Sequence, residues 1–175
     1  MNAFDDARLV EAEAMAVLLP FAKTHAKDGQ VVTTDKGALS IELQAMAGDV
    51  LLNASDGAVV GVEVKVERTS RHGNFFLETW SNICPERPKP GWLATLWSDV
   101  IWYYFIDTDD LYVMRRAELF RWAFEERNIY RYPEKEQGQR KQLNRTRGAC
   151  VPIVDVAAAI SVKVFHPRGS LAVAA

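Results

Sequence analysis

Several features that would place a chain in a familiar class are missing from this 175-residue sequence. It has only two cysteines, Cys84 and Cys150, far apart and without metal-ligand spacing, so we expect reduced thiols. No apolar run approaches the roughly 18 residues needed to cross a bilayer, and the N-terminal segment MNAFDDARLVEAEAM has acids where a signal peptide has a basic leader. We therefore expect a cytoplasmic protein.

Common catalytic motifs are missing as well. The three histidines, His25, His72 and His166, do not have the spacing of a metal finger or of a His-Asn-His nuclease. No glycine-rich phosphate loop is followed by Lys-Ser or Lys-Thr, so ATP is not implied, and Ser70 near His72 lacks a nucleophile elbow. These absences leave acids and lysines as the candidate chemistry.

Charge is unevenly distributed along the chain. The net charge is -2, but the segment from Arg115 to Arg147 holds ten Lys or Arg against five Glu, a net charge of +5. The remainder holds eleven basic residues against eighteen acids, a net charge of -7. A local basic surface on an acidic protein is therefore expected.

Hydrophobic periodicity predicts an α/β (α+β) fold with one mixed central sheet flanked by helices. The expected helices are 4–19, ended by Pro20, then 91–99 and 118–127. The expected strands are 37–43, 49–53, 59–67, 75–80, 100–107, 111–119 and 149–156, with an Asp-Gly hairpin turn within 53–58. We expect one domain over 1–165, with a basic loop at 131–147 and a tail at 166–175 without a pattern that demands order.

One acid interrupts the apolar face of the first predicted helix. Steps of about 100° per residue place Glu11 in the middle of the apolar positions and leave Glu13 outside them. A carboxylate is costly at such a position unless something pairs with it. Glu11 is therefore a candidate functional residue.

The strand predicted at 59–67 carries charge along one face. Side chains two residues apart point the same way, so Glu63 and Lys65 project from one face, about 6.6 Å apart along the strand. The valines at 62, 64 and 66 take the other face. The simplest interpretation of an isolated Glu-x-Lys is a half-exposed strand with a solvated charged side.

Asp49 changes that interpretation, because the Asp-Gly turn would bring it beside the Glu63 strand. Two carboxylates on adjacent strands can hold a hard divalent cation, Mg²⁺ or Mn²⁺, and leave positions for water and a phosphate oxygen. Lys65 can then pair with the carboxylates, lower the pKa of an attacking water or stabilise charge on phosphorus. Glu11 becomes the natural fourth member, by binding a metal or orienting a water.

These residues resemble the PD-(D/E)xK nucleases, a group that includes many restriction enzymes, phage exonucleases and Holliday-junction resolvases. The likeness is carried by Glu11, by Asp49 in GDVLL, and by Glu63 and Lys65 in VEVKVE, although Ala-Gly-Asp-Val replaces the nominal Pro-Asp. It implies a restriction-endonuclease-like mixed sheet and a Mg²⁺-dependent phosphodiesterase that leaves 5'-phosphate and 3'-hydroxyl ends. The carbonyl of Val64 would complete the metal shell.

A narrower likeness runs from LQAMAGDVLL to DLYVMRRAEL and is similar to a group of small phage and bacterial proteins placed among these nucleases. It nominates five further residues: Gln44, Glu78, Ser81, Trp92 and Asp99. Glu78 is either a partly buried acid near the metal or an edge residue. Trp92 either packs or stacks on a base, and Asp99 either caps, forms a salt bridge or takes part in catalysis.

The basic segment has the composition of a contact to a phosphate backbone. Its residues include Lys135, Arg140, Lys141, Arg145 and Arg147, with Tyr130 and Tyr132 beside them for stacking. A solvated loop is the alternative, since charge runs often are one. Beside a nuclease site, the segment indicates DNA as a partner.

The leading hypothesis from sequence is a metal-dependent DNA nuclease in which Asp49 and Glu63 bind Mg²⁺ or Mn²⁺ and Lys65 activates or positions water. The alternative is a catalytically silent protein of nuclease fold that binds nucleic acid or a host protein. A third hypothesis is a phage-encoded inhibitor or assembly factor whose aromatic residues within 78–92 form a protein interface. A homodimer, endo- or exonuclease action, and the form of the nucleic acid are left open.

Overall fold

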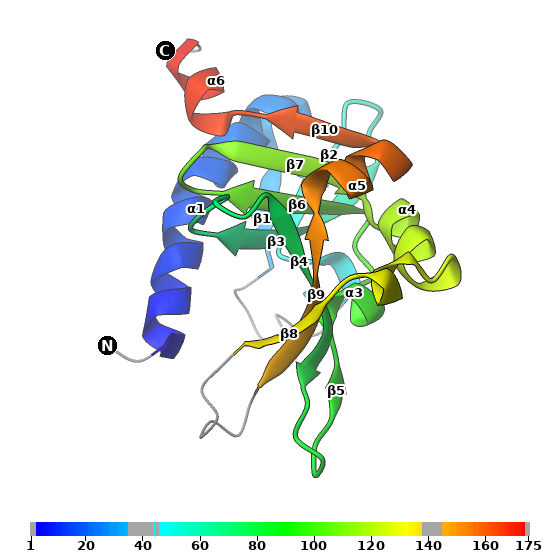
Figure 1. Cartoon of the computed structure of the whole chain (residues 1–175). Helices are drawn as coiled ribbons and strands as arrows, with labels where there is room; N and C mark the ends of the chain where they lie inside the picture. The colour runs from blue at the N-terminus through cyan, green and yellow to red at the C-terminus, as the bar shows by residue number, and fades with distance from the viewer. Residues whose placement is uncertain (1–2, 35–43, 45, 138–144, 174–175) are drawn as a thin grey trace. The chain divides into compact units, whose positions relative to one another are not determined.

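The computed structural model describes residues 3–34, 44, 46–137 and 145–173 (Figure 1). The chain divides into two compact units, and each is described by itself. Unit 1 comprises Met1–His72, Trp97–Met114 and Val162–Ala175, and unit 2 comprises Gly73–Leu96 and Arg115–Ser161. The strand expected at 37–43 lies outside the described residues. None of the described helices is long and apolar enough to cross a membrane.

Unit 1 is built on a six-stranded sheet with the strand order β1-β2-β3-β6-β7-β10. The strands are β1 (Val31–Thr33), β2 (Val50–Asn53), β3 (Val59–Glu67), β6 (Val100–Phe105), β7 (Asp110–Arg115) and β10 (Val162–Phe165). The pairs β1–β2, β2–β3 and β7–β10 are antiparallel, whereas β3 and β6 are parallel. The mixed α/β architecture predicted from the sequence is therefore confirmed.

The hairpin between β2 and β3 is confirmed as well. The amide of Ala54 donates to the carbonyl of Ala58 at 2.8 Å, and the amide of Ala58 donates to Oδ1 of Asp56 at 2.9 Å. Gly57 follows with a φ of +87°, a left-handed conformation that glycine adopts without steric cost. This turn fixes Val50 opposite Val62, so the start of β2 lies beside the middle of β3.

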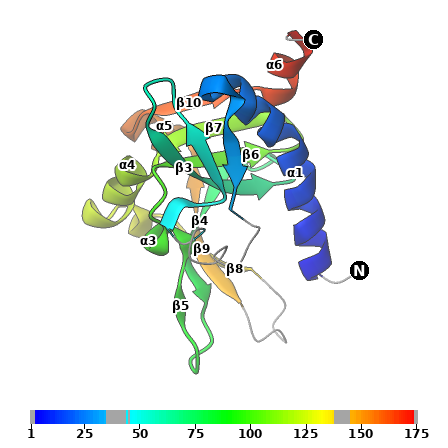
Figure 2. The same cartoon turned by 180° about the vertical axis from the view of Figure 1, so that it is seen from behind.

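Helix α1 (Ala3–His25) covers one face of this sheet (Figures 1 and 2). Leu18 and Phe21 are buried in one core cluster with Val62 and Val64. The prediction that Pro20 ends the helix is wrong, because the helix continues through it to its last residue. Proline removes one helical hydrogen bond, and burial of the large side chain that follows, at roughly 1.5–3 kcal/mol, offsets part of that loss.

The described part of the C-terminal segment, residues 162–173, forms a strand and a short helix, although no pattern in the sequence demands order there. A short helix, α6 (Pro167–Val173), follows β10. Near the other end of the chain, a 3₁₀ turn, η1 (Lys27–Gly29), lies between α1 and β1. The amide of Arg168 donates to Oδ2 of Asp109 at 2.9 Å, and the hydroxyl of Tyr104 donates to the other oxygen of that carboxylate at 2.8 Å. A contact to a residue about 60 positions earlier in the chain therefore anchors the tail.

Unit 2 contains a four-stranded sheet with the order β5-β4-β9-β8, in which all three pairs are antiparallel. The strands are β4 (Asn74–Asn82), β5 (Lys89–Pro90), β8 (Glu134–Gln137) and β9 (Thr146–Pro152). The helical elements are α3 (Trp92–Thr95), α4 (Arg116–Phe120), the π-helical η2 (Arg121–Glu125), the 3₁₀ turn η3 (Asn128–Arg131) and α5 (Ile153–Ala159). Both cysteines, Cys84 and Cys150, are free.

Four expectations fail in unit 2, beginning with the strand expected at 111–119, which ends at Arg115 where helix α4 follows. The helix expected at 91–99 is limited to Trp92–Thr95, and the strand expected at 149–156 gives way to helix α5 at Ile153. The loop expected at 131–147 contains β8 and the first residues of β9. Glu136 lies opposite Arg147 in that strand pair, and opposite charges across an antiparallel pair stabilise it, so a charged sequence forms a strand here.

Candidate active site

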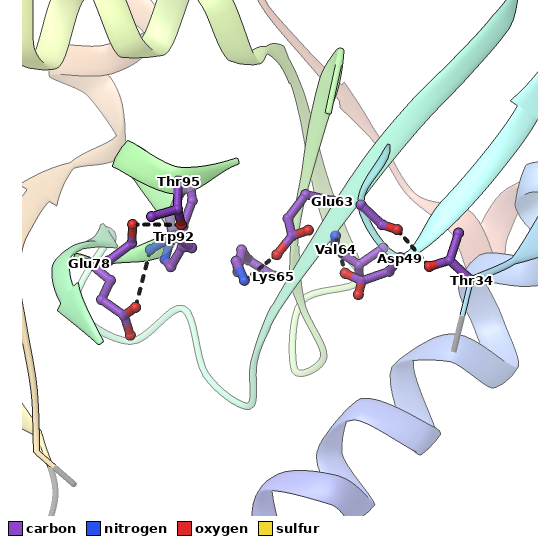
Figure 3. Close-up of polar contacts among 10 residues, drawn as sticks. Thr34, Asp49, Glu63, Val64, Lys65, Glu78, Trp92 and Thr95 are labelled. Carbon is purple, nitrogen blue, oxygen red and sulfur yellow. Dashed lines mark hydrogen bonds and ion pairs between the residues drawn. The ribbon is translucent and has the colours of Figure 1, made fainter. Parts of the chain in front are cut away.

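The charged face predicted on β3 is present and bears a closely bonded pair. Nζ of Lys65 donates to Oε1 of Glu63 at 2.5 Å (Figure 3). Glu63 is only 8% exposed, whereas the side chain of Lys65 keeps 26% of its surface accessible. Val62 and Val64 belong to the core on the other face of the strand. The simplest alternative, a fully solvated charged face, is therefore not what the structure shows at Glu63.

Asp49 reaches the same strand from the residue just before β2. Its amide donates to the carbonyl of Val62 at 2.8 Å, next to the Val50–Val62 pair at the end of the antiparallel register of β2 and β3. Its Oδ2 then accepts the amide of Val64 at 2.9 Å. The carboxylate thus accepts the amide that a carbonyl of a neighbouring strand would otherwise accept. This bond fixes Asp49 against Val64, the residue between Glu63 and Lys65.

A tight backbone bend directs Asp49 toward β3. Gly48 has a φ of +82°, and a Cβ atom there would lie 2.5 Å from the carbonyl oxygen of Val62. Thr34, buried to 1% exposure, donates its hydroxyl to the carbonyl of Gly48 at 2.6 Å and its amide to the carbonyl of Asp49 at 3.0 Å. Glycine is therefore required at 48 both by conformation and by space.

Electrostatics link Glu63 to the other acids nominated from the sequence. Burial raises the pKa of the Glu63 carboxyl above its ordinary value. The charge of Lys65 and its hydrogen bond lower this pKa, whereas the negative charges of Asp49 and Glu11 raise it. Glu63 therefore lies within electrostatic reach of all three other residues of the predicted set.

Glu11 is exposed rather than buried in the apolar face of α1. It stands one turn before Ala14, which is fully buried, and two turns before Leu18 on the same side of the helix. Val10, the residue before Glu11, packs against the core cluster of unit 1, so the exposure of Glu11 is local to its own position. The expectation of an acid amid a buried stripe is corrected, while its electrostatic effect on Glu63 remains.

Two other nominees in unit 1 form hydrogen bonds with backbone groups. The backbone carbonyl of Gln44 accepts the amide of Gly48 at 2.9 Å, a contact that does not depend on the Gln44 side chain. Oδ2 of Asp99 accepts the amide of Gly61 at 2.9 Å, and the Asp99 amide donates back to the carbonyl of the same glycine at 2.9 Å. Asp99 thereby joins the beginning of β6 to β3, which is the capping alternative.

The remaining nominees belong to unit 2. Oε1 of Glu78 accepts the amide of Trp92 at 3.2 Å, at the first residue of α3 (Figure 3). The carboxylate thus meets one of the amides that a helix start leaves without a helical partner. The hydroxyl of Ser81 donates to the carbonyl of Pro90 at 3.0 Å, which ties β4 to β5. Trp92 is half-buried.

Two arginines of the basic segment form ion pairs within unit 2. Arg145 and Arg147 each lie 2.9 Å from a carboxylate oxygen of Glu136. Arg140 and Lys141 lie outside the described residues. Ion pairs between such exposed groups are worth about 0–1 kcal/mol, so a phosphate could replace Glu136 as the partner. The role of these arginines in nucleic-acid binding stays a prediction.

Glu67 continues the row of Glu63 and Lys65 on the charged face of β3, as the two-residue period of the strand predicts, although it is not among the residues nominated for the site. Sequence reasoning missed one further contributor to this face. Tyr103, on β6, donates its hydroxyl to Oε1 of Glu67 at 2.5 Å. No local signal marks Tyr103, because the register of the parallel pair β3–β6 is needed to place it.

Comparison with known proteins gives no match, whether with protein-family models, with curated proteins or with solved structures. The function must therefore be inferred from the geometry of unit 1 and from the likeness of Glu11, Asp49, Glu63 and Lys65 to the nuclease pattern noted in the sequence.

Proposed function

We propose that this protein is a metal-dependent DNA nuclease whose active site is formed by Asp49, Glu63 and Lys65 with assistance from Glu11. One observation carries the proposal: a buried glutamate is bonded to a partly exposed lysine two residues away, and the intervening amide is bonded to an aspartate from the adjacent chain segment. The residues nominated by the Asp and Glu-x-Lys pattern thus lie around Val64 of β3, with Asp49 contributed by the segment before β2.

The donor set fits a hard divalent cation. Asp49, Glu63 and the carbonyl of Val64 offer oxygen ligands only, and Mg²⁺ is commonly bound through one or two carboxylates while it keeps several waters. Among the described residues, no group of three or more His, Cys, Asp or Glu side chains is arranged to hold a metal. The raised pKa of Glu63 indicates a place where added positive charge would be favourable.

Each residue of the proposed site then has a role. A bound Mg²⁺ or Mn²⁺ would supply Lewis acidity and a more acidic water. Lys65, which is held at Glu63 and is partly exposed, places an ammonium where a phosphate oxygen or an attacking water can be bound. Glu11 is exposed and adds negative charge near Glu63, so it can orient a water at the edge of the site.

Cleavage of labelled linear, circular, single-stranded and branched DNA tests the proposal, with Mg²⁺, Mn²⁺ or EDTA in parallel. Lys65→Ala should abolish metal-dependent cleavage, and Lys163→Ala, which removes an exposed lysine from edge strand β10 of the same sheet, should not. Circular dichroism checks that both variants fold. Cleavage that persists in Lys65→Ala would overturn the proposal.

The silent binding protein is the second candidate, because Lys65 already has Glu63 as a partner in the structure. Thermal unfolding with added Mg²⁺ separates the two functions without any substrate. A metal site should raise the melting temperature of the wild type as the ion concentration exceeds its dissociation constant, and Asp49→Asn should remove that rise. DNA binding that is insensitive to EDTA, without cleavage and without this shift, would favour the silent protein.

A further inference from the structure

Lys65 stands between two acids on the same face of β3. Glu63 and Glu67 are each two residues away from it, which places each about 6.6 Å away along the strand. Both are removed from full contact with water, since Glu63 is buried and Glu67 is half-buried. An ammonium on a flexible four-carbon stem could therefore bond to either carboxylate.

The structure shows one of these two arrangements. Nζ of Lys65 is bonded to Glu63, at 2.5 Å, while Oε1 of Glu67 is bonded to the hydroxyl of Tyr103, also at 2.5 Å. Each acid thus has its own donor.

Tyr103 is placed for this task by the register of the sheet. It lies opposite Lys65 in the parallel pair β3–β6, so the two side chains are neighbours on the same face, with strands about 4.8 Å apart. Tyr103 is 2% exposed, and the centre of its ring lies 5.4 Å from that of Phe105. A buried ring has little freedom to turn, so its hydroxyl remains directed at Glu67.

We propose that Tyr103 is a positioning residue, which occupies Glu67 with a neutral donor and so keeps the ammonium of Lys65 on Glu63. The inference rests on the proposed nuclease function for its consequence, since Lys65 acts only where Glu63 and Asp49 hold the metal. Glu67 is the competing acid of this arrangement, and Tyr103 acts on the reaction through Lys65 alone.

The consequence of removing the hydroxyl follows from hydrogen-bond energetics. Without it, Glu67 would be a half-buried carboxylate that lacks one hydrogen-bond donor, and such an unsatisfied group raises the free energy of the folded state. Lys65 carries a flexible donor on that face, two residues away, and the charge of His72 also acts on Glu67. Movement of Lys65 toward Glu67 would restore the bond and draw the ammonium away from Glu63.

The test compares the effect of Tyr103→Phe in two backgrounds. In the wild-type background we expect kcat for Mg²⁺-dependent cleavage to fall about tenfold, as for loss of one hydrogen bond involving a charged group, with KM little changed. In the Glu67→Gln background the same substitution should change kcat less than twofold, because no competing charge remains. A loss of equal size in both backgrounds, or no loss in the wild type, would overturn the inference.

Tyr104→Phe is the matched control. It removes a hydroxyl bonded to a carboxylate, that of Asp109 at 2.8 Å, from the adjacent position of the same strand. Tyr104 belongs to the core on the α1 side of the sheet, so kcat should stay at the wild-type value. This control separates a specific effect of Tyr103 from the general cost of losing a buried hydroxyl.

A second measurement does not depend on cleavage. The ¹H–¹⁵N signal of the Lys65 ammonium, assigned with Lys65→Arg, should move in Tyr103→Phe and return toward its wild-type position when Glu67→Gln is added. If the wild type cleaves no DNA but this pattern appears, the nuclease proposal fails and the positioning role stands. If cleavage occurs and the signal does not respond, the positioning role fails alone.

Discussion

The carboxylate of Asp49 accepts the backbone amide of Val64, at 2.9 Å, where the ladder between β2 and β3 ends. The contact unites a structural and a chemical role in one side chain. A carboxylate has two oxygens and about four lone-pair positions, so one bond to an amide leaves capacity for a cation. The position of the acid relative to Glu63 and Lys65 is thus set by the backbone rather than by side-chain packing.

Substitution of Asp49 should separate these two roles. Asp49→Asn keeps an oxygen that can accept the Val64 amide, so stability should change little, whereas Asp49→Ala should lower the free energy of unfolding by about 1–3 kcal/mol. Both variants should lose metal-dependent cleavage, because neither retains the charge. Urea unfolding and the cleavage assay measure the two effects; equal destabilisation by both changes would show that the amide contact contributes nothing.

The two left-handed glycines of the β2–β3 region should differ in their tolerance of alanine. Gly48 and Gly57 have φ values of +82° and +87°, so alanine costs roughly 1–2 kcal/mol at either from conformation alone. Nothing lies within 4 Å of a Cβ at Gly57, but at Gly48 the carbonyl oxygen of Val62 would lie 2.5 Å away. We therefore expect Gly48→Ala to be clearly the more destabilising in urea unfolding, and the only one of the two to impair cleavage. Equal losses would contradict the crowding argument.

The raised pKa of Glu67 predicts that the stability of the protein depends on pH. Burial raises the pKa of its carboxyl above the ordinary value of 4.5, although the hydrogen bond from Tyr103 and the charge of His72 lower it. Because the folded protein then holds this proton more tightly than the unfolded chain does, the free energy of unfolding falls as pH rises from the unfolded pKa through the raised folded pKa.

Glu67→Gln removes this titration and so tests it. The difference in free energy of unfolding between variant and wild type should shift in favour of the variant as pH rises through that window, and it should be constant below and above it. Urea unfolding in steps from about pH 4 to pH 8 covers the window. A difference that does not change with pH would show that Glu67 titrates alike in both states.

Local sequence rules predicted the parts of the site that depend on a single strand or a single turn. The two-residue period placed Glu63 and Lys65 on one face, and the Asp-Gly turn brought Asp49 to the same strand. Glu11 shows the limit of such rules, because helical angles give the direction of a side chain but not how much of it its neighbours cover. Tyr103 shows another, since its partner Glu67 is 36 positions away and depends on strand register.

The same limit applies to the basic segment. Its composition predicted a loop that binds phosphate, but the charges of Glu136, Arg145 and Arg147 also suit a pair of antiparallel strands, and the structure forms that pair. Composition counts the charges without showing which of them compensate one another. Whether the arginines also contact DNA is therefore a question about competition between a carboxylate and a phosphate.

Glu136→Gln tests that competition. Loss of the carboxylate should leave Arg145 and Arg147 without their shared ionic partner, so binding to a labelled duplex in EDTA should become tighter. The slope of log K against log salt should steepen by up to about 0.9 for each additional phosphate contact. Fluorescence anisotropy at several salt concentrations measures both quantities.

Glu134→Gln is the matched control, because it removes the same charge from an exposed position on the same strand and leaves both ion pairs of Glu136 intact. If both variants tighten binding equally, the effect belongs to net charge and not to release of the arginines. If Glu136→Gln weakens binding instead, Glu136 acts by holding the two guanidinium groups in place for the phosphate. Only tighter binding and a steeper slope specific to Glu136→Gln would assign Arg145 and Arg147 to the DNA contact that their positions in the sequence predict.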